Sequence, residues 1–173
     1  MQDHVDFVLA QWARERPDLD VSSMAVLSRV FRLNTLAMRD VERTFRRHGI
    51  QQGEFDLLAT LYRSGAPHSL SPQQLVDALL LSSGAMTNRL DRLEQAGLVA
   101  RRRNPDDRRG IIVSLTAQGR AVLRKALDDY LAQLDALLAP LSRSDRARLS
   151  TLLRRLLAGH DRAAPGAIAG DAP

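Results

Sequence analysis

The feature that most constrains this chain is a succession of local patterns that begins at residue 71. The tetrapeptide Ser71-Pro72-Gln73-Gln74 supplies a helix cap, a proline suited to the first helical position and a glutamine able to bond back to the cap. It predicts a short helix from 72 to about 80. After a break at 81–83, a second helix is predicted up to Gly97, a residue typical of helix C-termini. The inward face of this second helix carries Met86, Leu90 and Leu93.

Two runs typical of β-strands follow, at 98–103 and 110–115. Between them lies Asn104-Pro105-Asp106-Asp107-Arg108-Arg109, a basic segment rich in turn-forming residues. A short helix, a break, a second helix and a β-hairpin, in this order, predict a winged helix-turn-helix. The second helix is then the recognition helix and the hairpin is the wing. The expected fold class is mainly α, with a small β-hairpin wing.

Helices are also expected on both sides of this module. Before it they run over 3–16, from Asp20 or Ser22 to Gly49, and over 52–64. After it, Thr116 caps a long helix that ends before Pro140, and a last helix begins at Ser142 and ends near 159. The pattern divides the chain into N-terminal helices at 1–49, a winged helix-turn-helix domain at 50–116, C-terminal helices at 117–160 and a disordered tail at 161–173.

The last two predicted helices carry more apolar surface than a small winged module can cover. Their apolar residues include Leu123, Leu127, Leu131, Leu134, Leu149, Leu152, Leu153, Leu156 and Leu157. An enlarged monomer core is one explanation. We favour dimerisation helices from two chains that pack together, because a twofold homodimer is the commonest closed assembly. Such a dimer would place two recognition helices about 34 Å apart, which matches successive major grooves of a palindromic site on double-stranded DNA.

Charge is unevenly distributed along the chain. The formal net charge is +5, but residues 82–120 hold eight arginines against four acidic residues, whereas residues 1–20 are net acidic. Because the basic stretch coincides with the predicted recognition helix and wing, we expect its partner to be DNA and not an anionic membrane. The residues expected to contact DNA are Ser82, Ser83, Gly84, Thr87, Asn88, Arg92, Arg102, Arg103, Asp107, Arg108 and Arg109. The alternative is an ordinary solvated polar face.

Several other functions are disfavoured by what the sequence lacks. There is no cysteine, so disulfides, thiolate metal sites and cysteine-based sensing are excluded. The four histidines are scattered, and no nucleophile elbow or phosphate-binding loop occurs, so neither an enzyme nor a cofactor or metal is expected. No apolar run is long enough to cross a bilayer, and the N-terminus is acidic where a signal peptide would be basic. We therefore expect a cytoplasmic protein with no membrane partner.

The segment from LSPQQLVDALLLSSGAMTNRL to NPDDRRGIIVSLTAQGRAVL closely resembles the MarR family of bacterial regulators, over roughly residues 25–158. The resemblance implies a dimer held by the N- and C-terminal helices, repression of a neighbouring gene, and release by a small anionic or phenolic ligand. It also implies that Asp107 and Arg109 are the aspartate and arginine of the wing.

A narrower resemblance points to the urate-responsive branch of that family. It is carried by Trp12 on the extra N-terminal helix, Asp56, Arg89 and Arg101, and it implies that these four residues bind the ligand. Ser64 departs from the branch, which can carry asparagine there. Two other interpretations stay open: Asp56 as an exposed partner of Arg63, and Trp12 as a packing residue. The functional hypotheses are a ligand-responsive repressor and, alternatively, an architectural DNA-binding protein without an effector.

Overall fold

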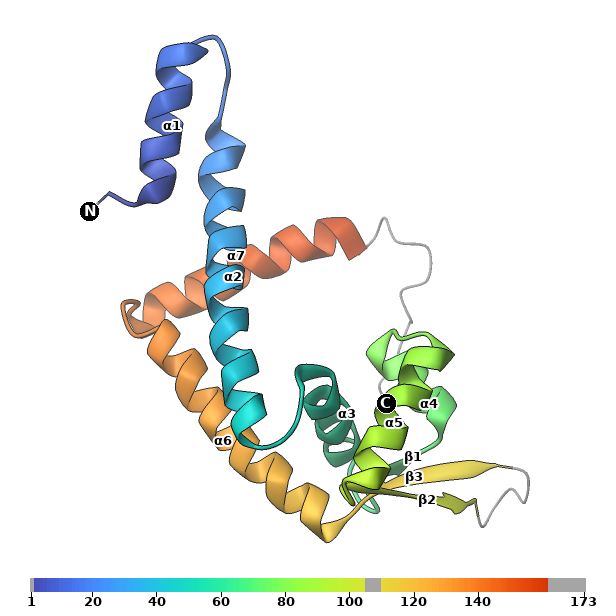
Figure 1. Cartoon of the computed structure of the whole chain (residues 1–173). Helices are drawn as coiled ribbons and strands as arrows, with labels where there is room; N and C mark the ends of the chain where they lie inside the picture. Colours follow the sequence, from blue (N-terminus) through green and yellow to red (C-terminus); the bar gives the residue numbers. More distant parts are fainter. Residues whose placement is uncertain (1, 105–109, 162–173) are drawn as a thin grey trace. The chain divides into compact units, whose positions relative to one another are not determined.

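A computed structural model describes residues 2–104 and 110–161 of the chain (Figure 1). The chain forms two compact units, one ending at Gln133 and the other beginning at Leu134. These units are coarser than the four predicted segments, whose boundaries stay a prediction, and the predicted disordered tail lies outside the described residues apart from Asp161. In the described part, no helix is long and apolar enough to span a membrane.

The first unit contains three N-terminal helices, a helix-turn-helix and a small sheet. Its elements are α1 (His4–Glu15), α2 (Ser22–Arg47), α3 (Gln52–Arg63), β1 (Ser69–Leu70), α4 (Pro72–Leu79), α5 (Ser83–Gln95), β2 (Val99–Arg103) and β3 (Ile111–Leu115), followed by most of α6 (Ala117–Leu137). The expected helices and strands are all present within two residues of their predicted bounds. The predicted caps also hold, since Ser71 and Gln74 form a capping box and the Thr116 hydroxyl accepts from the amide of Gly119 at 2.9 Å.

The core of the first unit lies where α2, α3, α5 and the sheet meet. An aromatic cluster joins α2, α3 and α6, because the Phe45 ring stacks on Phe55 at 4.3 Å between centroids and Tyr130 packs against both rings. Around it lies a continuous set of buried aliphatic side chains, which includes Leu57, Leu58, Leu61, Leu75, Met86, Leu90, Leu93, Val113 and Leu123. The recognition helix and the wing are therefore fixed to the same core as the end of α2.

The N-terminal helix α1 packs along the first half of α2 (Figure 1). Asp3 caps α1, and Arg29 of α2 bonds to Asp3 at 2.8 Å and to Asp6 at 2.5 Å. The Arg29 guanidinium lowers the pKa of Asp3 below its usual range. An exposed ion pair contributes little by itself, and the apolar contacts of Val5 and its neighbours with α2 supply the rest of the attachment.

The sheet has three antiparallel strands in the order β1-β3-β2. The wing hairpin pairs Val99 with Leu115 and Arg103 with Ile111. The third strand, β1, was not predicted, because two residues are too few to show an alternating pattern. It pairs Ser69 with Ser114, and their hydroxyls are 2.7 Å apart, so the base of the wing is tied to the segment that precedes α4.

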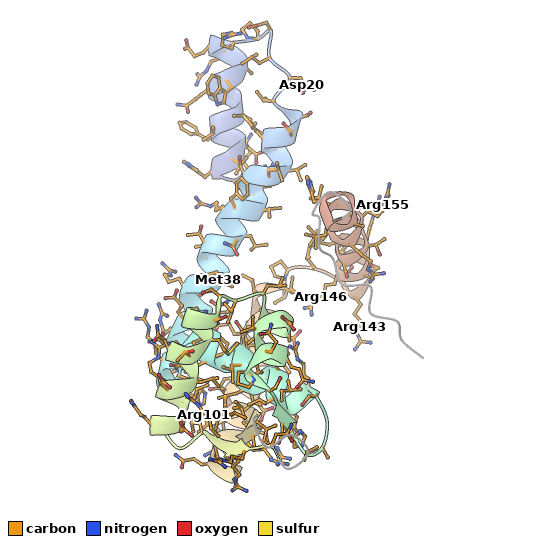
Figure 2. All side chains as sticks on the ribbon, turned by 90° about the vertical axis from the view of Figure 1, so that its right-hand side faces the viewer. Asp20, Met38, Arg101, Arg143, Arg146 and Arg155 are labelled. Atoms are coloured by element: carbon orange, nitrogen blue, oxygen red, sulfur yellow. The ribbon has the colours of Figure 1, made fainter. Side chains whose placement is uncertain are left out.

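The second unit consists of the end of α6 and α7 (Arg143–Asp161). Ser142 caps α7 as predicted, accepting from the amide of Asp145 at 3.2 Å. No residue from 143 to 160 is buried, although the helix carries several large apolar side chains. Leu152, Leu156 and Leu157 are 51%, 45% and 60% exposed. Figure 2 shows side chains projecting from all sides of α7, including those of Arg143 and Arg155. Within the second unit as the structure describes it, the large apolar side chains of α7 are therefore largely exposed.

Candidate nucleic-acid interface

The recognition helix α5 has one buried face and one exposed face. Met86, Leu90 and Leu93 are at most 3% exposed, as the helical periodicity predicts. Ser82 caps the helix and its hydroxyl accepts from the amide of Ala85. The opposite face starts with Ser83 and leaves the first turn of the helix open to solvent. That turn therefore presents backbone amides and the positive end of the helix dipole, which suit a phosphate.

The exposed face of α5 offers small and polar side chains. Gly84, Thr87 and Asn88 are all exposed. A Cβ atom placed on Gly84 would meet nothing within 4 Å, so a DNA surface can approach the helix closely here. The Thr87 hydroxyl donates to the Ser83 carbonyl at 3.0 Å, which leaves its methyl group and an oxygen lone pair for a partner. Such groups match the donors, acceptors and methyl groups of base edges.

Arg92, also predicted to contact DNA, is engaged with the neighbouring helix. Its Nε lies 2.9 Å from Oε1 of Glu54, a carboxylate that also accepts from the amide of Gln51 at 2.7 Å. The Glu54 side chain is only 9% exposed, whereas that of Arg92 is 50% exposed. Arg92 thus ties α5 to α3 and keeps its outer nitrogens accessible. No local sequence pattern indicates this pair, because 38 residues separate the two partners.

Arg101, expected in a ligand site, connects the wing to the recognition helix. Its guanidinium bonds to Asp91, and its backbone amide donates to Glu94 at 3.0 Å. Its Nε lies 3.4 Å from Glu94, too poorly aligned for a hydrogen bond but close enough for charge attraction. Figure 2 marks Arg101 beside the sheet at the end of α5. In this arrangement Arg101 neutralises two acidic groups that would otherwise repel a nucleic acid.

The next two arginines of β2, Arg102 and Arg103, are exposed. They carry the basic character of the wing among the described residues. The other predicted wing contacts, Asp107, Arg108 and Arg109, lie outside the described residues. These exposed arginines of β2 and the exposed face of α5 lie on adjacent elements, because α5 packs against β2.

Of the four residues expected to bind a ligand, two lie close together. Arg89 of α5 is half-buried and its guanidinium lies against Gly53 of α3, whose missing side chain leaves the space: an ideal Cβ would be 2.5 Å from the Arg89 Cζ. Burial raises the pKa of the half-buried Asp56 carboxyl, while the nearby charges of Arg89 and Arg63 act to lower it. Asp56 is therefore not a fully exposed partner of Arg63, and the two arginines only partly offset the effect of burial on its pKa.

The other two are not part of this pair in the single chain. Arg101 bonds to α5, and Trp12 is 38% exposed on α1, which packs on the first half of α2 while α3 follows its end (Figure 1). Ser64, where the resemblance departs, caps the end of α3 and donates to the Leu61 carbonyl at 2.8 Å. Among the described residues no cluster of acidic groups and histidines suits a metal ion.

A recognition helix with an exposed polar face, a basic wing and a helix-turn-helix on one core define a winged helix-turn-helix protein of the DNA-binding class. The model of the MarR family matches residues 50–111. The regulator PecS of Dickeya dadantii is 38% identical over 152 residues, which cover 88% of this chain and 92% of that protein. The chain belongs to the MarR family of transcriptional regulators.

Two solved structures support the fold. A mutant of Escherichia coli MarR in complex with operator DNA is 27% identical, with a TM-score of 0.66, and the match covers 80% of this chain and 99% of that one. AbsC from Streptomyces coelicolor is 22% identical with a TM-score of 0.73, covering 84% and 98%. The predicted fold class and family are confirmed. The particular DNA contacts and the ligand residues stay predictions.

Proposed function

We propose that this protein is a homodimeric repressor that binds a palindromic operator and releases it when a small anionic or aromatic ligand binds. The observation that carries the DNA-binding part is the exposed face of α5, with Gly84, Thr87 and Asn88 beside the arginines of the wing. In this proposal α5 enters the major groove and the wing lies along the minor groove, where arginine is favoured by the negative potential. The protein then acts in the cytoplasm, where its operator is accessible.

The proposed dimer is supported by apolar side chains that one chain leaves uncovered. They occur on α7 and on the first half of α2, where Val26 and Phe31 are 59% and 65% exposed. Exposed apolar surface of this extent on terminal helices is typical of an interface. The acidic α1 region and the arginine-rich α7 have opposite charge, which suits contact between two copies.

The proposed ligand site is built on Asp56 and Arg89. Arg89 cannot bridge to Asp56 or to a planar anion such as urate, a related purine or an aromatic acid and also serve DNA in the same pose, because one guanidinium has one set of donors. Arg89 belongs to the recognition helix, so an anion that binds its guanidinium would shift α5 relative to DNA. Trp12 and Arg101 are included as the remaining two ligand contacts. A tenfold loss of operator affinity needs only about 1.4 kcal/mol of such coupling.

An experiment separates this proposal from an architectural DNA-binding protein without an effector. Operator binding is measured by fluorescence anisotropy at fixed salt with and without urate, for wild type, Asp56→Ala and Trp12→Ala. The operator is the duplex that the wild-type protein enriches from a randomised pool. We expect urate or a related acid to weaken wild-type binding, and both variants to respond less while retaining DNA affinity. No response to any of these ligands favours the architectural role, and equal responses of all three proteins place the ligand elsewhere.

A further inference from the structure

Leu80 occupies a backbone position that disfavours its side chain. It ends α4 with φ 51° and ψ 45°, in the left-handed region, and its amide bonds to the Val76 carbonyl. The amide of Leu81 bonds to the same carbonyl at 3.2 Å, so the turn closes the helix in the way that normally calls for glycine. A leucine here is strained, because its Cβ crowds the backbone.

A second residue with positive φ shows how the fold can offset such backbone strain. His68 is the other non-glycine residue with positive φ in the described part of the chain, at 59°. Its ring stacks on Tyr62 at 5.2 Å, and its Nδ1 lies 3.1 Å from the Tyr62 carbonyl, so packing and bonding stabilise its conformation. Leu80 is 86% exposed and receives no such compensation from the fold. A strained residue whose described contacts do not offset the strain indicates a role in binding.

The position of Leu80 identifies the partner. It lies two residues before Ser82, the cap of the recognition helix, and next to the exposed first turn of α5. We propose that Leu80 makes an apolar contact with the operator at the edge of the major groove, against either a thymine methyl group or deoxyribose carbons. The inference rests on the proposed DNA-binding function and adds to it a contact that charge and hydrogen-bonding arguments overlook.

A second copy of the chain suits this side chain less well. The uncovered apolar faces lie on the first half of α2 and on α7. Leu80 is instead at the end of α4, which packs on α3, α5 and β3. Leu80 thus stands, exposed, in the turn that joins α4 to the N-terminus of α5, the end of the recognition helix proposed to meet DNA.

The test compares Leu80→Gly and Leu80→Asn with Leu80→Met, using the full-length protein and the duplex enriched by wild type. Glycine and asparagine tolerate positive φ, so we expect both variants to unfold at or above the wild-type temperature. We expect both to bind the duplex about tenfold more weakly per dimer, which corresponds to about 1.4 kcal/mol. Their salt dependence should match wild type because no charge changes, and Leu80→Met should retain most of the affinity.

His68→Gly is the matched control, since it changes the other strained residue. It should unfold at a lower temperature because it loses the Tyr62 contacts, and it should bind DNA as wild type does while folded. Deoxyuridine in place of each thymine, combined with hydroxyl-radical footprinting, separates the two apolar partners. A methyl contact appears as a loss for wild type that Leu80→Gly lacks, and a sugar contact as lost protection of deoxyribose in the variant.

Wild-type affinity in Leu80→Gly and Leu80→Asn would overturn the inference. So would a fall in their melting temperature of more than about 4 °C, which would make Leu80 a stabilising residue of the fold. A change in their oligomeric state, measured by sedimentation, would assign the side chain to a protein interface. Failure of the wild-type protein to enrich any duplex would contradict the proposed function itself, and is distinct from these outcomes.

Discussion

At the scale of single residues, two glycines make opposite predictions for the same substitution. A Cβ on Gly119 would lie 2.0 Å from the Leu98 backbone oxygen, so Gly119→Ala must push α6 away from the start of the wing. We expect it to lower the free energy of unfolding by roughly 1–3 kcal/mol. Gly84→Ala meets open space in the first turn of α5 and should raise stability, by less than the roughly 0.5–1 kcal/mol typical of a helix centre. Chemical denaturation measures both, and equal effects would show that α6 does not pack as described.

Asp56 makes a prediction about pH. Burial raises its pKa in the folded state above the value of 3.8 expected for an unfolded chain. The folded state then binds the proton more tightly, so ionisation destabilises it as pH rises from about 3.8 through the raised pKa. Asp56→Asn should therefore be more stable than wild type at pH 7, and the difference should vanish as pH falls through that window. Thermal unfolding over a pH series tests this, and a less stable variant at pH 7 would mean that Arg89 and Arg63 dominate.

At the scale of elements, Arg101 controls how the wing and recognition helix present charge. Arg101→Gln removes the cation that pairs with Asp91 and lies near Glu94, and leaves both carboxylates uncompensated beside the proposed DNA-binding surface. We expect about tenfold weaker operator binding, or about 1.4 kcal/mol. Adding Asp91→Asn to this variant should restore part of the affinity, because it removes one of the repelling charges. Anisotropy titrations at one salt concentration measure both effects, and no recovery in the double variant would argue against this neutralising role.

The elements also show how much of the fold and of the candidate site could be predicted from the sequence. Helix bounds and caps follow local rules, so Ser71, Thr116 and Ser142 could be assigned from neighbouring residues alone. The pairing of Arg101 with α5 and that of Arg92 with Glu54 depend on tertiary geometry, which local patterns do not encode. The strand β1 is defined by its partner β3 and not by its own two residues. The left-handed conformation of Leu80 was missed because leucine is not a residue expected there.

At the scale of the whole molecule, the apolar surface of α7 predicts an obligate dimer. A chain truncated after Pro140 loses a helix in which no residue from 143 to 160 is buried, so the core of the first unit should keep its contacts. The partner surfaces would nevertheless become exposed to water, and we expect loss of the dimer and aggregation. A chain that ends at His160 is the control and should remain dimeric in sedimentation experiments. A stable, folded monomer of the shorter chain, or a stable dimer of it, would show that the interface is misplaced.

The central claim is that α5 and the basic wing bind DNA, and the salt dependence of operator binding tests it most directly. If each chain neutralises three or four phosphates, log K should fall against log salt concentration with a slope of roughly −5 to −7 for the dimer. Replacing Arg102 and Arg103 together by glutamine removes four charges per dimer and should reduce the magnitude of that slope by about 3 to 4. A slope near zero for wild type, or an unchanged slope in the double variant, would contradict the account.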